Sequence, residues 1–230
     1  MKKLVVLSGA GVSAESGIKT FRDSGGLWEG YDVMQVASPE GWESDQELVL
    51  NFYNERRKKA LTAVPNEGHK IIAELEGHFD VTVITQNIDN LHEKAGSSKV
   101  IHLHGELFKS RSTADSNLVY DIDGWELKTG DTCEKGSQLR PHIVWFGEMV
   151  PMMDVAVEEA LSANIFIVIG TSLQVYPAAG ILEYVKESVP KYIIDPNMPN
   201  VNYRPNLHLI EEVGSKGMQI VRKRLLTDFL

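Results

Sequence analysis

Three things are scarce in this sequence, and each scarcity excludes a class of protein. Cys133 is the only cysteine, so no internal disulfide can form, which is typical of a protein that works in a reducing cytosol. No apolar run reaches the roughly 18 residues of a membrane-spanning helix, so we expect no membrane segment. Basic residues number 23 against 32 acidic ones, and the net charge of −9 argues against nucleic acid as the main partner. We therefore expect a cytoplasmic protein.

What remains is an ordinary globular composition, with 43% apolar and 24% charged residues. A chain of 230 residues suffices for one domain, or for one large domain with a small insert. The first residues, MKKLVVLSGAG, begin like a secretion signal, with two lysines ahead of an apolar stretch. That stretch is too short for a signal, so we interpret it as a first strand.

Short apolar runs recur along the chain, and each is followed by polar or glycine-containing sequence. Continuous runs of this kind are typical of strands buried on both faces. Helical patterns lie between several of them, and the alternation predicts an α/β fold with a parallel sheet covered by helices. The runs are residues 4–7, 81–84, 100–103, 165–169 and 191–194, and the helical stretches are 46–64, 66–76, 154–163, 178–187 and 216–226.

The polar phrases that follow these runs are SGAG, TQNIDN, HGE, GTS and DPN. Ligands bind such sheets outside the carboxyl ends of the strands, so we expect the five phrases to converge on one crevice. Two stretches lack this pattern. Residues 19–45 form a long irregular segment of a kind that is often functional, and residues 109–140 read as a small β-containing insert.

The first glycine-rich segment, GAGVSAESG at residues 9–17, directly follows the first predicted strand. Gly9, Gly11 and Ala14 satisfy the spacing G-x-G-x-x-G/A, in which glycines let backbone amides approach a pyrophosphate. A tight strand-to-helix turn without a ligand would have the same sequence. No clean second strand ending in Asp or Glu follows, which disfavours a standard dehydrogenase, and no Gly-Lys-Ser/Thr follows, which excludes a Walker loop.

Five motifs decide between these alternatives: GAGVSAESGIKTFR, TQNIDNLHEKAG, HLHGEL, RPHIVWFGE and GTSLQVYPAAG, in this order. Together they resemble the sirtuins, NAD-dependent protein-lysine deacylases, over about residues 4–196. The resemblance implies a single catalytic domain over 1–230, in which NAD and an acylated lysine of a protein substrate meet in a cleft. Its Rossmann-like core would comprise about 1–18, 66–108 and 141–230, its helical and loop part about 19–65, and its small module about 109–140.

The resemblance also implies roles for individual residues. His104 matches the catalytic base, a role that suits an imidazole because its ordinary pKa lies near neutrality, and Asn87 belongs to the same reactive set. The acyl group would pass to ADP-ribose with release of nicotinamide. The residues implied to bind NAD are Gly9, Ala10, Gly11, Ser13, Ala14, Glu15, Phe21, Arg22, Trp28, Gln86, Asn87, Ile88, Asp89, Gly170, Thr171, Ser172, Asp195 and Asn197.

Some of these assignments leave alternatives open. Asp195 or Asn197 would serve the adenosine side, and the sequence does not choose between them. Residues 214–218 would form an adenine-side loop. The phrase NIDN is also typical of a turn that caps the next helix, an interpretation that stays open for Asn90.

Two further segments match the side of the site that binds the substrate. Val144, Trp145, Phe146 and Gly147 match the strand that pairs with the substrate backbone. Residues 47–60 predict a helix with Tyr53 and Arg56 on one face, and this pair matches the one with which desuccinylase-type sirtuins, bacterial members included, hold an acidic acyl group. We expect removal of succinyl or malonyl groups, and of acetyl too. The alternative is that Arg56 pairs with a carboxylate elsewhere in the fold.

The chain departs from the family in its small module, where most sirtuins hold structural zinc with four cysteines. Cys133 is the one cysteine present, and Ser112 falls where a first cysteine would be expected. We therefore predict that zinc is not bound and that apolar packing holds the module together. The residues expected to do so are Leu118, Tyr120, Ile122, Trp125 and Leu127.

Two other functions remain open at this point. One is an ADP-ribosyltransferase or NAD hydrolase that uses the same site, and the other is a non-catalytic sensor that binds NAD or ADP-ribose. The substrate strand and the Tyr53–Arg56 pair favour deacylation, and retention of His104, Asn87 and Asp89 argues against a sensor. The oligomeric state is not predicted.

Overall fold

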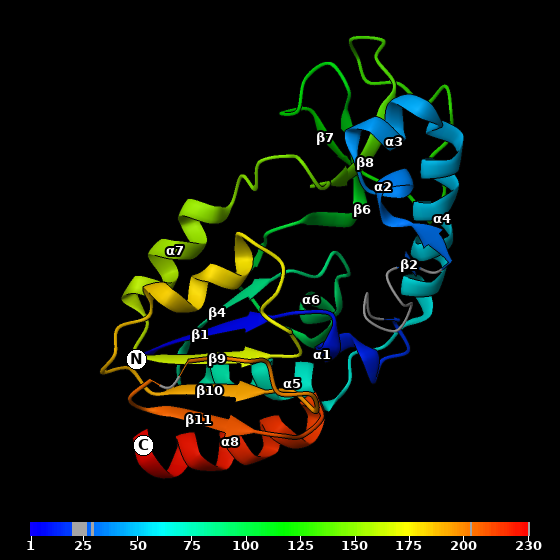
Figure 1. Ribbon diagram of the computed structural model, residues 1–230. Helices are drawn as coiled ribbons and strands as arrows, with labels where there is room; N and C mark the ends of the chain where they lie inside the picture. The colour runs from blue at the N-terminus through cyan, green and yellow to red at the C-terminus, as the bar shows by residue number, and fades with distance from the viewer. Residues whose placement is uncertain (20–26, 29, 203, 230) are drawn as a thin grey trace.

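The computed structural model describes residues 1–19, 27, 28, 30–202 and 204–229. Its larger layer is a parallel sheet of six strands in the order β11-β10-β9-β1-β4-β5 (Figure 1). The predicted α/β fold is confirmed. The strands are β1 (Lys3–Ser8), β4 (Asp80–Thr85), β5 (Val100–His102), β9 (Ile165–Ile169), β10 (Lys191–Ile194) and β11 (Leu207–Ile210).

Strand order places a switch in chain direction at the centre of this sheet. From β1 the chain moves outward through β4 to β5, and it then returns to β9 on the other side of β1 and moves outward through β10 to β11. This is the strand order of the Rossmann fold, whose ligands bind where the order reverses. The crevice is therefore expected outside the carboxyl ends of β1 and β9.

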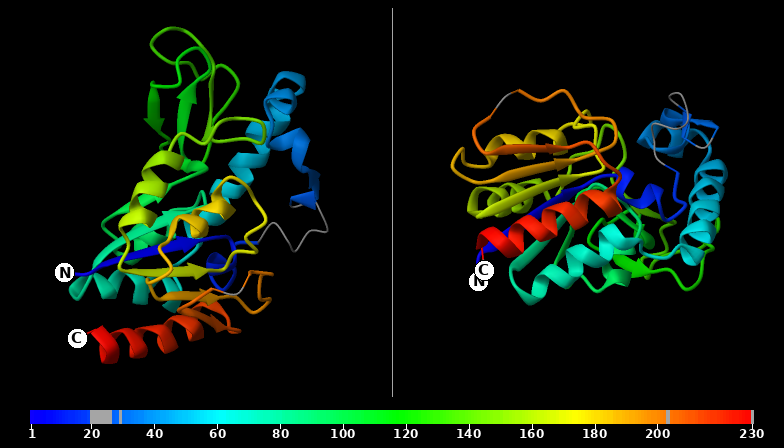
Figure 2. Two further views of the ribbon diagram at one scale, coloured as in Figure 1. Left: turned by 60° about the vertical axis from the view of Figure 1, so that its left-hand side comes forward. Right: turned by 90° about the horizontal axis from the view of Figure 1, so that it is seen from below.

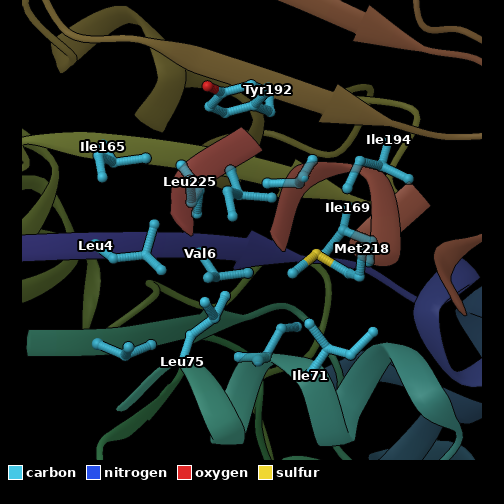
Figure 3. Packing of buried hydrophobic residues seen from close by; sticks show 14 of the residues in the cluster. Leu4, Val6, Ile71, Leu75, Ile165, Ile169, Tyr192, Ile194, Met218 and Leu225 are labelled. Atoms are coloured by element: carbon cyan, nitrogen blue, oxygen red, sulfur yellow. The ribbon is translucent and has the colours of Figure 1, made fainter. Parts of the chain in front are cut away.

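Helices cover both faces of the sheet, which explains why its central strands are buried on almost every residue (Figures 1 and 2). One face carries α5 (Glu67–Glu74) and α8 (Gly214–Phe229), and the other carries α7 (Met153–Ser162) and the 3-10 helix η3 (Ala178–Tyr184). In Figure 3, Leu4 and Val6 of β1 lie between side chains of α5 and α8. Val5 and Leu7, which alternate with them, pack toward α7 and η3.

Three local predictions for this layer need correction. The sixth strand, β11, was not predicted, because this short edge strand exposes His208 and Leu209 and lacks a continuous buried run. The helical stretch 178–187 is a shorter 3-10 helix. Residues 214–218, expected as an adenine-side loop, form the first turns of α8, where Gly217 lies so close to β10 that an added Cβ would be 2.1 Å from Ile194 Cγ2.

The part between β1 and β4 is mainly helical. It contains the hairpin strands β2 (Leu27–Trp28) and β3 (Tyr31–Asp32), and then α2 (Val33–Val36), α3 (Pro39–Ser44) and α4 (Gln46–Thr62). Ser38 caps α3 by accepting from the Gly41 backbone N–H at 3.0 Å, and Asp45 caps α4 by accepting from that of Leu48 at 2.9 Å. The predicted helix over 46–64 is thus confirmed to within two residues.

The small module is an antiparallel sheet in the order β7-β6-β8, drawn at the top of Figure 1. Its strands are β6 (Gly105–Ser112), β7 (Val119–Asp121) and β8 (Leu139–Ile143). The boundaries expected at 108/109 and 140/141 fall inside β6 and β8. Of the apolar residues expected to hold the module together, only Leu127 is fully buried, and the other four are half-buried.

A buried arginine that sequence reasoning missed joins α4 to this module. Arg57 is 0% exposed and donates to the backbone oxygens of Leu107 at 2.6 Å and Trp125 at 2.5 Å. It also donates to Asn54 Oδ1 at 2.6 Å, and Asn54 in turn exchanges hydrogen bonds with the backbone of Leu127. Burial lowers the pKa of Arg57 to about 10, so the guanidinium remains charged at neutral pH.

Within the residues that the model describes, no helix is long and apolar enough to cross a membrane.

Candidate active site

The loops that follow β1 and β9 touch each other backbone to backbone at the switch point. The Gly9 N–H donates to Ile169 O at 3.0 Å, and the Gly11 N–H donates to Gly170 O at 2.8 Å. A Cβ added to Gly11 would lie 2.7 Å from the Gly170 Cα, and one added to Gly9 would lie 2.6 Å from the Thr171 Cβ. The glycines are required by this contact between loops, a role that the spacing motif did not distinguish from closeness to a phosphate.

The polar residues after β4 join these loops through buried side chains. Asn87 Nδ2 donates to Gly9 O and to Ser13 Oγ, both at 3.1 Å. Ser13 Oγ donates to Asp89 Oδ2 at 3.0 Å, and burial raises the pKa of the Asp89 carboxyl. Gln86 Nε2 completes the set by donating to Thr171 Oγ1 at 3.1 Å. Of the five phrases predicted to converge, SGAG, TQNIDN and GTS therefore meet through these contacts.

A hydroxyl and histidine network that sequence reasoning missed lies beneath this cluster. Ser8 Oγ is 2.9 Å from Thr85 Oγ1 and 2.9 Å from His92 Nε2, and all three side chains are buried. Thr85 Oγ1 also accepts from the Asn87 N–H at 3.0 Å. A hydroxyl at the end of each of two adjacent strands was the only available signal in the sequence.

His104 lies between β5 and β6, and one hydrogen bond fixes which of its ring nitrogens carries the proton in the neutral imidazole. Its Nδ1 is 3.0 Å from Gln86 O, and a carbonyl oxygen only accepts, so Nδ1 carries the proton. The other nitrogen, Nε2, has no hydrogen-bond partner among the described residues. Burial lowers the pKa of His104, so at neutral pH Nε2 is a free proton acceptor.

His102 provides an instructive contrast two residues earlier. Both of its nitrogens face acceptors, Asn87 O at 3.1 Å and Glu93 Oε1 at 2.7 Å. Burial lowers its pKa, but the hydrogen bond and charge of Glu93 outweigh that effect and raise the pKa overall. Both ring nitrogens of His102 are therefore engaged by acceptors, which makes it less suited than His104 to act as a base.

The predicted acyl-recognition pair lies on α4, beside Trp28 of the irregular segment. The Arg56 guanidinium carbon is 4.2 Å from the centroid of the Trp28 ring, and the rings of Trp28 and Tyr53 meet edge to face at 6.3 Å. Arg56 is half-buried, whereas Tyr53 is 0% exposed. Burial raises the pKa of the Tyr53 phenol, so this group stays protonated.

The segment expected as the substrate strand does not form a strand here. β8 ends at Ile143, and the backbone N–H groups of Val144 and Phe146 donate to His104 O and Ala37 O, both at 2.9 Å. Gly147 then turns with φ +91°. Phe146 is 42% exposed, but Trp145 is 2% exposed, so its indole faces the protein interior.

Several other residues predicted to bind NAD make different contacts. Glu15 is engaged by α8, because its carboxylate accepts from the Ser215 N–H at 2.9 Å and from Ser215 Oγ at 2.6 Å. Asp195 is buried and accepts from the Asn197 N–H at 2.9 Å, so the two form one turn after β10.

The capping interpretation that was open for Asn90 is not supported by its side chain. Asn90 is the N-cap residue of α6 (Leu91–Ala95) but makes no side-chain capping bond, and Asp89 accepts from the Leu91 N–H instead.

The remaining predicted residues make local backbone contacts, are partly or fully buried, or lie outside the described part of the chain. Ala10 O and Ala14 O accept local turn bonds within and after α1 (Gly11–Ala14), and Ser172 is half-buried in the turn after β9. Ile88 is buried, and its carbonyl accepts from the Leu107 N–H at 2.7 Å. Phe21 and Arg22 lie outside the described residues.

The donor set of the small module does not fit a structural zinc ion, which takes four ligands. The Cys133 thiol is buried and lies 3.3 Å from Ser112 Oγ. No group of three or more His, Cys, Asp or Glu that could hold a metal gathers anywhere in the described ranges. That the protein binds no zinc stays a prediction.

Comparison of this chain with known proteins gives a consistent result. The model of the Sir2 family matches residues 9–177. A protein of Bacteroides thetaiotaomicron named NAD-dependent protein deacylase is 52% identical over 98% of this chain and 99% of its own length. A protein of Helicobacter pylori with the same name is 52% identical over 98% of both chains.

Solved structures agree with these relatives. A Sir2 homologue mutant in complex with ADP-ribose has a TM-score of 0.90 at 38% identity, covering 100% of this chain and 95% of that one. A Sir2 homologue in complex with NAD has a TM-score of 0.88 at 39% identity, covering 98% and 90%. A Sir2 protein bound to acetylated peptide has a TM-score of 0.81 at 30% identity, covering 96% and 92%. On the motifs, the strand order and these similarities, the chain belongs to the Sir2 family.

Proposed function

We infer that this protein is an NAD-dependent protein-lysine deacylase, and we propose His104 as its catalytic base. The name of its relatives at 52% identity supports the activity. The tautomer of His104 is the observation that supports its role as the base. Gln86 O holds the proton on Nδ1, which leaves Nε2 to take a proton from a ribose hydroxyl at neutral pH.

NAD supplies nicotinamide as a leaving group and ADP-ribose as the acyl acceptor. The Gly9–Gly11 loop and the turn at Gly170, which meet at the switch point, would bind it. Asn87 and Asp89 are held in place there through Ser13, so these groups lose little conformational entropy when they bind a ligand. Similar structures of Sir2 homologues in complex with ADP-ribose and with NAD support the binding of NAD.

We also propose that the enzyme accepts acidic acyl groups, such as succinyl or malonyl, as well as acetyl. The side chains of Arg56, Trp28 and Tyr53 gather on one face of α4. A guanidinium binds a carboxylate with two parallel hydrogen bonds, and a protonated phenol adds a third donor. Because Tyr53 is enclosed and Arg56 is half-buried, the carboxylate meets Arg56 first.

Nicotinamide release from NAD tests the activity. It is measured without peptide, with acetyl-lysine peptide and with succinyl-lysine peptide, for the wild type and for His104→Ala. Release that needs peptide and disappears in the variant is expected. Release without peptide would establish the NAD hydrolase alternative, and binding of NAD without release would establish the sensor.

Arg56→Met tests the acyl preference separately. The variant keeps the aliphatic length of the side chain and removes its charge, so turnover of succinyl peptide is expected to fall while turnover of acetyl peptide persists. Unchanged succinyl turnover would refute the acidic-acyl proposal and leave the deacylase intact.

The remaining proposals concern the chain as a whole. We propose that residues 1–230 work as one catalytic domain in the cytoplasm, on acylated lysines of proteins and without zinc. The single cysteine and the net charge of −9 support the location and the exclusion of nucleic acid.

A further inference from the structure

The indole of Trp145 and the phenol of Tyr53 share one buried hydrogen bond. Trp145 Nε1 lies 3.1 Å from Tyr53 Oη, and the two residues are 2% and 0% exposed. An indole N–H can only donate. Tyr53 Oη must therefore accept, and its own hydrogen is left to donate in another direction.

Trp145 is itself held firmly from its other side. The guanidinium carbon of Arg140 lies 3.3 Å from the centroid of the indole, and the ring of Trp42 packs at 5.8 Å. The backbone N–H of Trp145 donates to Glu148 Oε2 at 2.8 Å. The orientation of the indole N–H is thus set by contacts that do not involve Tyr53.

Arg140 is not a competing reader of a substrate carboxylate. It donates to Glu148 Oε1 at 2.8 Å and to Ile143 O at 3.0 Å, and Arg111 donates to the same Glu148 carboxylate. Burial has the largest effect on the pKa of the Tyr53 phenol and raises it, the charges of Arg56 and Arg140 lower it, and that of Glu148 raises it. The Arg56 guanidinium and the Tyr53 ring both contact Trp28, so the cation and the phenol that accepts from Trp145 lie beside the same ring.

We propose that Trp145 is a positioning residue for acyl-group specificity, whose N–H holds Tyr53 so that the phenol donates to the carboxylate of an acidic acyl group beside Arg56. The inference rests on the proposed acceptance of such groups. Trp145 was predicted to contact substrate, but its burial means that its side chain acts through Tyr53. A neutral acetyl group has no carboxylate to meet the phenol, so its recognition does not depend on this bond.

Trp145→Phe removes the N–H and keeps an aromatic ring in place. We expect the KM for succinyl peptide to rise about 3- to 10-fold, as for the loss of one hydrogen bond, while kcat and the KM for acetyl peptide stay within about 2-fold. Trp125→Phe is the matched control, because it removes the same group from a ring whose cation-π partner is Lys58, at 3.8 Å. It should leave both KM values unchanged.

A double-mutant cycle separates positioning from general support of the fold. If Trp145 acts through Tyr53, then Tyr53→Phe with Trp145→Phe has the same succinyl KM as Tyr53→Phe alone. Additive effects, an equal rise of KM for both peptides, or no change in Trp145→Phe would overturn the inference. Should Trp145→Phe fail to fold, benzothienylalanine at position 145 replaces the N–H with sulfur at nearly constant ring size, and the same expectations apply.

The same experiments distinguish failure of the role of Trp145 from failure of the acidic-acyl proposal on which it rests. A wild-type enzyme that does not turn over succinyl peptide overturns the acidic-acyl proposal and the role of Trp145 with it. A wild type that uses succinyl peptide, with Trp145→Phe unchanged, overturns the role of Trp145 alone.

Discussion

Replacing Gly170 by alanine tests whether the two loops at the switch point must touch. Gly170 has φ +64°, and an added Cβ would lie 2.2 Å from the backbone nitrogen of Val12 and 2.6 Å from the Gly11 carbonyl carbon. The left-handed conformation costs about 1–2 kcal/mol for alanine. Forcing the loops apart adds about 1–3 kcal/mol of overpacking, and loss of the bond between Gly11 and Gly170 adds about 1 kcal/mol.

These terms predict that Gly170→Ala loses about 3–6 kcal/mol of unfolding free energy. Gly136→Ala is the matched control, because Gly136 has φ +75° with nothing within 4 Å of an added Cβ. It should lose only the conformational cost, about 1–2 kcal/mol. Urea unfolding followed by circular dichroism measures both values.

Binding of NAD by the same two variants provides the functional half of the test. Titration calorimetry should show at least about a tenfold rise in Kd for Gly170→Ala, since a loss of about 1.4 kcal/mol suffices. Gly136→Ala should bind as the wild type does. If the two variants lose equal stability and bind NAD equally, the contact between the loops is not what requires glycine, and the argument from steric closeness is refuted.

Three further predictions follow from single groups. Arg57→Met leaves the carbonyls of Leu107 and Trp125 without their buried donor, so the unfolding free energy should fall by about 2–4 kcal/mol; a loss below about 1 kcal/mol in urea unfolding would contradict this. Because burial lowers the pKa of His104, the acid limb of kcat/KM should lie below pH 6.5, and a limb centred above pH 7 would contradict its role as the base. Elemental analysis of purified protein should find far less than one zinc per chain, and dialysis against a chelator should leave the melting temperature unchanged; an equimolar content would refute the zinc-free module.

Much of the large domain follows from local pattern. The runs around Val5, Val83 and Ile167 are apolar on every residue except Thr82, and a strand covered on both faces makes that sequence favourable. Once strands and helices alternate, a parallel sheet brings all their carboxyl ends to one edge. For this reason, the sequence alone predicts that the loops containing Gly9, Gln86 and Gly170 lie together.

Other features depend on partners distant in sequence, and no local pattern encodes them. The buried arginine of α4 is Arg57, whose three acceptors come from α4 itself and from the module. Glu15 has the sequence context of a cofactor loop, yet Ser215, 200 residues away, takes its carboxylate. Which polar group is left for a ligand is decided by which partners the fold brings near.

Local pattern was therefore sufficient for the strands, the crevice and the residue types that line it, because periodicity and strand-end position are properties of neighbours along the chain. The tautomer of His104, the enclosure of Tyr53 and the inward turn of Trp145 were decided only by tertiary packing. The tautomer depends on the bond to Gln86 O, and the direction of a hydrogen bond exists only once both partners are in place. The orientation of Trp145 depends on Arg140, Trp42 and Glu148, which only the fold brings around the indole.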